Sequence, residues 1–158
     1  MLTIRRYRRK DHDAVWELHN VALYQVGAHA GNGPWDDDLH DIERVYIESG
    51  GEFLVGELDG LIVAMGAIRP LGEGRAEVKR MRVHPGYQRR GFGQAILTAL
   101  EEAARRTGFR VLTLDTTVKQ VPAQRLYEKN GFRPVRRTVL AGFECIIYEK
   151  EIGRTGPA

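Results

Sequence analysis

Apolar and polar residues alternate with a period of two in seven short segments, each bounded by turn residues. This period is typical of strands with one buried face, so we expect strands at residues 2–7, 53–58, 61–68, 76–83, 111–117, 133–140 and 143–150. Asp59-Gly60 and Ala141-Gly142 each lie between two consecutive segments. They predict two tight hairpins.

In four other segments, apolar residues recur every three to four positions, which is the period of an amphipathic helix. The predicted helices cover residues 11–25, 39–47, 94–106 and 122–129. In the third helix, Leu97, Leu100 and Ala104 form one apolar stripe. A glycine-rich link at residues 27–34 separates the first two helices, and its His29 and Trp35 just beyond it are candidate contacts for a substrate.

The predicted order is β-α-α-β-β-β-α-β-α-β-β. This order indicates an α/β protein of the α+β type, with one mixed sheet and helices packed on its faces. A length of 158 residues suits one domain with a core of its own. We therefore expect a single domain over residues 1–152 and a flexible tail at 153–158.

Composition restricts the class of protein and its surroundings. Hydrophobic residues make up 42% of the chain and charged residues 28%, as in ordinary globular proteins. No apolar run approaches the ~20 residues that a membrane span needs, and the first residues lack the pattern of a signal peptide. A single cysteine excludes an internal disulfide, so the cytoplasm is the expected location.

The charge of the chain is mildly basic, with a net charge of +3. Basic residues cluster at 5–10, 79–90 and 133–137. Such clusters can bind nucleic acid, but aromatic residues for base stacking are not interleaved with them. A polyanionic small molecule accounts for this charge better than a nucleic acid does.

The stretch Gln88-Arg89-Arg90-Gly91-Phe92-Gly93 directly precedes the predicted helix at 94–106. Two glycines and a helix start let several main-chain N–H groups converge on one anion, and the two arginines add positive charge. The stretch therefore predicts a cradle for a phosphate or pyrophosphate. It differs from the Rossmann glycine pattern and from a P-loop, although glycines before a helix can also form a plain turn.

Two blocks of residues resemble one family. Val83-His84-Pro85 leading into Gln-x-x-Gly-x-Gly at 88–93 is similar to the acyl-CoA motif of the GNAT superfamily of N-acetyltransferases. The block at 123–132, Ala-Gln-Arg-Leu-Tyr-Glu-Lys-Asn-Gly-Phe, resembles the second landmark of that family. Both occur in the family's order and at a similar interval, and the predicted element order matches the GNAT fold.

The resemblance implies a binding site for acetyl-CoA. In that family the strand before the cradle diverges from its neighbour, and the pantetheine of the cofactor lies in the resulting V-shaped slot. The resemblance implies that the cofactor contacts Met81, Arg82, Val83, Gln88, Arg89, Arg90, Gly91, Phe92, Gly93 and Gln94. Gln120 is a further candidate, although the family often has Asn at this position and Gln reaches one methylene further.

Two residues are candidates for the chemistry. Tyr127, in the second block, is the candidate general acid for the departing thiolate, because a phenol stays protonated at neutral pH. Glu77 lies six residues before Val83, where the family's catalytic glutamate can fall, and is the candidate base, acting directly or through water. Glu77 could instead pair with Lys79 or Arg80.

The predicted activity is transfer of the acetyl group of acetyl-CoA to a primary amine by direct attack in a ternary complex. Cys145 lies in a strand pattern without a nearby base, which argues against an acetyl-cysteine intermediate. The acceptor, a small-molecule or peptide amine, is not identified by the sequence. Dimers are common in the family, but no residue pattern here marks one.

Other functions remain open on the sequence alone. The same glycines could serve a nucleotide-phosphate enzyme, and a degenerate GNAT domain could sense acyl-CoA or bind RNA without catalysis. The acidic run Asp36-Asp37-Asp38 could hold a metal, but acidic residues at a helix start are more simply explained by the helix dipole. We therefore expect no metal site. If this run lines the acceptor slot, its charge could attract a cationic amine.

Overall fold

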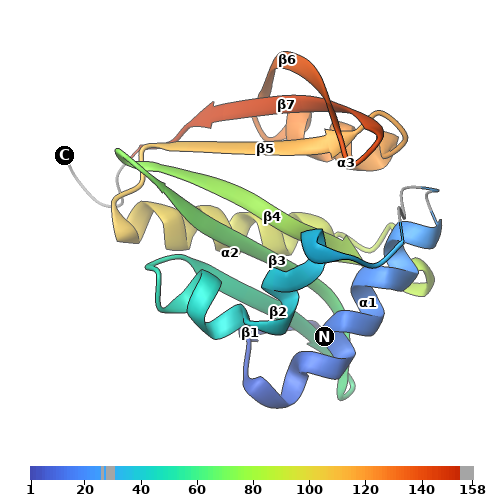
Figure 1. Ribbon diagram of the computed structural model, residues 1–158. Helices are drawn as coiled ribbons and strands as arrows, with labels where there is room; N and C mark the ends of the chain where they lie inside the picture. The colour runs from blue at the N-terminus through green and yellow to red at the C-terminus, as the bar shows by residue number, and fades with distance from the viewer. Residues whose placement is uncertain (26, 28–30, 154–158) are drawn as a thin grey trace.

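The predicted strands assemble into one seven-stranded sheet in the order β1-β2-β3-β4-β5-β7-β6 (Figure 1). The structure is a computed structural model that describes residues 1–25, 27 and 31–153. His29 and the tail from residue 154 lie outside this part of the chain. The strands are β1 (Thr3–Arg6), β2 (Glu52–Leu58), β3 (Leu61–Gly72), β4 (Arg75–Val83), β5 (Val111–Thr117), β6 (Arg133–Leu140) and β7 (Phe143–Glu151).

Strands β4 and β5 are the parallel neighbours in this sheet, and they pair only briefly. Their register contains Arg75–Val111, Ala76–Leu112 and Glu77–Thr113, and the ladder stops there. Beyond this point β4 stays paired with β3, while β5 stays paired with β7 as far as Thr117–Cys145. The two strands therefore diverge (Figure 1), which confirms the V-shaped opening that the family resemblance implies.

In the described part of the chain, three α-helices and several shorter helical segments pack on the two faces of the sheet. The helices are α1 (His12–Gln25), α2 (Phe92–Thr107) and α3 (Val121–Lys129), and the shorter helical segments are η1 (Arg9–Asp11), η2 (Pro34–His40), η3 (Glu43–Ile47) and η4 (Pro85–Tyr87). No helix in the described part of the chain is long and apolar enough to cross a membrane.

The prediction of one α-helix at 39–47 is wrong. The chain forms a 3-10 segment, η2, and a single π turn, η3, separated at Asp41, whose φ of −150° is not helical. The apolar residues that suggested the helix, Leu39, Ile42 and Tyr46, are all buried in one cluster. A spacing of three to four residues fits 3-10 and π turns as well as an α-helix. Packing of these residues against the sheet therefore decides which of the three conformations forms.

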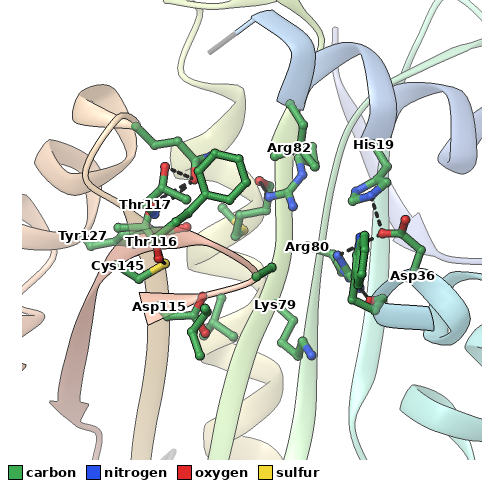
Figure 2. A pocket seen from close by; sticks show the side chains of 18 of the residues that line it. His19, Asp36, Lys79, Arg80, Arg82, Asp115, Thr116, Thr117, Tyr127 and Cys145 are labelled. Carbon is green, nitrogen blue, oxygen red and sulfur yellow. Dashed lines mark hydrogen bonds and ion pairs between the residues drawn. The ribbon is translucent and has the colours of Figure 1, made fainter. Parts of the chain in front are cut away.

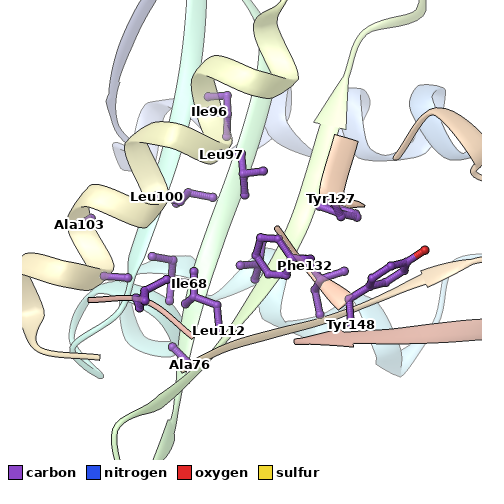
Figure 3. Close-up of a cluster of buried hydrophobic side chains, with 14 of the residues drawn as sticks. Ile68, Ala76, Ile96, Leu97, Leu100, Ala103, Leu112, Tyr127, Phe132 and Tyr148 are labelled. Atoms are coloured by element: carbon purple, nitrogen blue, oxygen red, sulfur yellow. The ribbon is translucent and has the colours of Figure 1, made fainter. Parts of the chain in front are cut away.

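The core consists of two clusters, one on each face of the sheet. Residues of α2 and α3 pack with the sheet in the first cluster, which includes the predicted stripe Leu97, Leu100 and Ala104, each fully buried (Figure 3). Residues of α1, η2 and η3 form the second cluster with β2 and β3. Different helices therefore cover the two faces of the sheet, and β4 lies between these two layers of helices.

A bulge in β4 changes the direction of its side chains just before the motif at 83–93. The register with β3 shifts between Met65 and Ala67, and Arg80 has a φ of +60°. Gly66 lies at this shift, and an added Cβ there would be 2.6 Å from Met81 Sδ and 2.7 Å from Ile96 Cγ2. The close approach of β3, β4 and α2 at the bulge therefore requires glycine.

We expect Gly66→Ala to destabilise the protein by about 1–3 kcal/mol, because the new methyl group has no space in a packed core. The midpoint of urea unfolding measures this effect. Gly153→Ala is the matched control, since nothing lies within 4 Å of a Cβ at that position. Equal midpoints for the two variants would contradict the proposed packing at the bulge.

Candidate active site

A cavity of about 320 Å³ opens where β4 and β5 diverge. Its walls come from five parts of the chain: β4 from Val78 to Arg82, β5 from Asp115 to Thr117, Tyr127 of α3, the β6–β7 hairpin, and the α1–η2 region. Figure 2 shows His19, Asp36 and Arg80 on one side and Asp115, Tyr127 and Cys145 on the other, with Arg82 between them. The divergence of the strands thus brings together residues that are far apart in the sequence.

The predicted anion cradle has the expected backbone geometry. Gly91 has a φ of +78° and precedes the first residue of α2, and no side chain caps this helix end. The helix's hydrogen bonding begins with Ala95 N–H donating to Gly91 O, so the N–H groups of Phe92, Gly93 and Gln94 come before it. Such unpaired N–H groups and the positive end of the helix dipole suit a phosphate.

The arginines beside the cradle are accessible to a ligand. Arg89 and Arg90 are exposed, and the Arg90 guanidinium lies 5.2 Å from the centre of the Tyr87 ring. The side chain of Gln88 is hydrogen-bonded to Gln25, and that of Gln94 to Asn130. Because both glutamine side chains are already hydrogen-bonded, their main-chain groups are the ones available to a ligand.

Four of the predicted cofactor residues lie on the two diverging strands or close to their ends. Met81 and Arg82 line the cavity, whereas Val83 packs against the core cluster under α2 and does not line it. Gln120 lines the cavity too, and its Oε1 accepts hydrogen bonds from Thr117 N at 3.3 Å and Thr117 Oγ1 at 3.2 Å. Gln120 therefore holds the end of β5 in place.

Tyr127 is buried except where it meets the cavity. Its side chain is 5% exposed, and its ring packs edge-on against Phe132 at 5.8 Å. Its hydroxyl makes no hydrogen bond with any residue in the described part of the chain. Burial raises the pKa of Tyr127 well above its ordinary value, and the positive charge of Arg82 only partly opposes this. The phenol therefore holds its proton at neutral pH and has it free to donate.

Glu77 lies on β4 at the last pair with β5, and it is not among the residues that line the cavity. Burial raises the pKa of its carboxyl group, and the charge of Lys79 opposes the shift. A raised pKa makes a carboxylate a stronger base. Glu77 therefore carries a carboxyl group of raised pKa next to the cavity-lining part of β4 but outside the lining itself.

The α1–η2 side of the cavity carries a network that the sequence did not predict. His19 is 1% exposed, and its Nε2 lies 2.9 Å from Asp36 Oδ1. Burial and the charges of Arg82 and Arg80 lower the pKa of His19 to about 4, so the ring is neutral at pH 7. Its place on the apolar face of α1, beside Leu18 and four residues after Val15, is the signal that could have identified it.

Arg80 completes this network on the strand side. Its Nε and Nη2 donate to the two carboxylate oxygens of Asp38 at 3.0 and 2.6 Å, and Nη2 also donates to Trp35 O. The Tyr46 hydroxyl donates to Asp38 as well. Two of the three consecutive acidic residues, Asp36 and Asp38, are therefore hydrogen-bonded within the protein itself.

Two further expectations concern metals and Cys145. Among residues 1–25, 27 and 31–153, no group of His, Cys, Asp and Glu side chains has the geometry of a metal site. Cys145 lines the cavity but is buried, and burial raises the pKa of its thiol. Its Sγ lies near Phe143 O rather than a base. The thiol is therefore protonated, as expected for a structural cysteine.

Comparisons with known proteins agree with this geometry. The model of the acetyltransferase (GNAT) family matches residues 12–132. An uncharacterized N-acetyltransferase of Escherichia coli, YjgM, is 28% identical over 137 residues, which are 84% of this chain and 82% of that protein. The N-acetylaspartate synthetase of Xenopus tropicalis is 33% identical over 100 residues, which are 62% of this chain and only 37% of that protein.

Solved structures show the same fold. A GNAT acetyltransferase from Staphylococcus aureus has a TM-score of 0.89 at 23% identity, over 96% of this chain and 99% of that one. The yncA protein of Salmonella typhimurium, solved with its cofactor acetyl-CoA, has a TM-score of 0.79 at 21% identity, over 100% of this chain and 98% of that one. The chain therefore belongs to the GNAT family of acetyltransferases, whose acyl donor is acetyl-CoA.

Proposed function

We propose that this protein transfers the acetyl group of acetyl-CoA to the amine of a small molecule, by direct attack while both substrates are bound. The observation that carries the proposal is the divergence of β4 and β5, which opens the cavity beside a buried tyrosine whose hydroxyl has no protein partner. A cavity of about 320 Å³ is of the size that small-molecule sites have.

The donor would be held by main-chain groups of two adjoining elements. The N–H groups at the start of α2, with Arg89 and Arg90 beside them, suit its pyrophosphate. The edge of β4 that β5 leaves after Glu77 suits the pantetheine, because its polar main-chain groups have no ladder partner from β5. The main chain of Met81, Arg82 and Val83 belongs to this edge, and Gln120 supports the opposite strand.

The protein's own residues would move protons at both ends of the reaction. An amine must lose a proton before it can attack, and we propose Glu77 as the acceptor of that proton through water. A main-chain N–H of β4 would stabilise the negative charge that develops on the thioester oxygen. As the carbon–sulfur bond breaks and the amide bond forms, Tyr127 would give its phenolic proton to the departing sulfur.

Ligand binding and turnover together test the proposed function. We expect CoA, and not ATP, to raise the melting temperature, with about 2.7 kcal/mol of added stability at 100 times its Kd. Release of CoA thiol should follow when acetyl-CoA and a panel of amines are added. Stabilisation by CoA without turnover of any amine would favour an acyl-CoA sensor instead. Stabilisation by ATP alone would favour a nucleotide-phosphate enzyme.

We expect Tyr127→Phe to slow turnover by roughly 10–100-fold, since a thiol is a fair leaving group and needs only modest help from an acid. Single-turnover rates measure this when chemistry limits the rate. Tyr148→Phe is the matched control: Tyr148 is also buried, its hydroxyl donates to Glu128, and it does not line the cavity. An unchanged rate in Tyr127→Phe would remove this residue from the mechanism.

A further inference from the structure

The guanidinium of Arg82 faces the cavity without an acidic partner. Its Nη1 donates to Met81 O at 2.8 Å, and this is the hydrogen bond that ties it to the protein. Its Nε is enclosed and has no hydrogen-bond partner in the part of the chain that the structure describes. Nη2 likewise donates to none of the described residues. Because Nε is enclosed and Nη1 is engaged, Nη2 is the group of the guanidinium that is left for a ligand.

Arg80, two residues earlier on the same strand, also lines this cavity but has carboxylate partners, in contrast to Arg82. It forms two hydrogen bonds to the carboxylate of Asp38, and Asp36 lies 3.9 Å from its Nη1. The side chains of Arg80 and Asp38 are each 11% exposed. Figure 2 shows Arg80 turned toward Asp36, and Arg82 between this network and Tyr127.

A buried cation without a partner is costly, so the state of Arg82 indicates a missing ligand. Burial and the charge of Arg80 lower the pKa of Arg82 to about 10, and the group is still charged at neutral pH. A carboxylate suits the open Nη2 group, because it supplies both a negative charge and an oxygen that accepts a charge-assisted hydrogen bond.

The other unpaired charges in the cavity restrict which amine can enter. Lys79 on β4 and Asp115 on β5 also line it, and neither forms an ion pair with a described residue. Around the cavity, Lys79, Arg80 and Arg82 stand against Asp36, Asp38 and Asp115, because His19 is neutral and does not offset Asp36. The charges balance overall, but Arg82 and Asp115 have no ion-pair partner among the described residues and lie on the two diverging strands. An amine that also carries an anionic group would match both of them.

We propose that the acceptor is a small amine that also carries a carboxylate, as an amino acid does, and that Arg82 binds this carboxylate. This inference rests on the proposed acetyl transfer and adds the substrate class. Arg82 then has two separate functions, because its main chain borders the donor on the strand edge while its side chain faces the acceptor. Asp115, on the opposite strand, lies where it can attract the ammonium group.

The test compares amino acids with their own carboxamides as acceptors for the wild-type protein. We expect kcat/KM to be at least about 10-fold higher for the amino acid, the usual effect of a charged hydrogen bond in a site that is built for it. The α-amine next to an amide has a pKa of only about 8 and is more often neutral. Basicity alone would therefore favour the carboxamide, which makes a preference for the acid decisive.

The variant Arg82→Met should raise KM for the amino acid by about 10–100-fold and leave KM for acetyl-CoA within about twofold. It should also abolish the preference for the acid over the amide. Arg82→Lys should keep part of that preference, because it keeps the charge and loses the fixed position of the Nη2 donor. Arg106→Met, an exposed arginine in the last turn of α2, is the control for removal of one positive charge.

Different results overturn different parts of this account. Equal kcat/KM for acids and amides in the wild type would overturn the inference and leave the acetyltransferase function in place. This comparison uses only the wild-type protein, so it does not depend on the folding of a variant. A rise in KM for acetyl-CoA in Arg82→Met, equal to that for the amino acid, would assign the guanidinium to the donor. Absence of thiol release with either class of amine would overturn the proposed function itself.

Discussion

The β4–β5 ladder ends after three residue pairs, and the site depends on this early ending. Two adjacent parallel strands would normally share a ladder along their full length. Here β4 keeps its pairing with β3, and β5 keeps its pairing with β7, so neither strand loses its own partner when they separate. The helices α2 and α3 pack against the same core cluster below the opening. The cavity is therefore built into the strand pairing and does not need a movement of the chain.

Charge is distributed unequally within this cavity. On the α1–η2 side, His19 is hydrogen-bonded to Asp36 and Arg80 is paired with Asp38, so the charged groups there have partners within the protein. Toward β5, Arg82 has no ion-pair partner among the described residues and its Nε has no hydrogen-bond partner there, and no described residue hydrogen-bonds to the Tyr127 hydroxyl. Groups that already have a partner gain less from a ligand than groups without one, and apart from the buried Nδ1 of His19 the groups without a partner lie toward β5.

The sequence was most informative where a local pattern has one structural solution. The hairpin at Asp59-Gly60, the stripe on α2 and the glycines before it are set by contacts within a few residues, and all are present in the structure. The region at 34–47 was predicted poorly, because spacing of three to four residues does not separate α, 3-10 and π turns. Glu77 was chosen from its distance to Val83 along the chain, and that distance does not reveal that it stays outside the cavity lining.

By itself, the sequence determined the strands in their chain order, the glycine turn before α2 and the family, because each depends on local periodicity or on a contiguous motif. Tertiary structure alone decided which side chains share the cavity. His19, Arg82 and Asp115 come from three separate elements and line the same cavity because β4 leaves β5 after Glu77 and then bulges at Arg80. Whether a charged side chain has a partner is a property of that three-dimensional neighbourhood, so no pattern along the chain could show that Asp38 neutralises Arg80 while Arg82 remains unpaired.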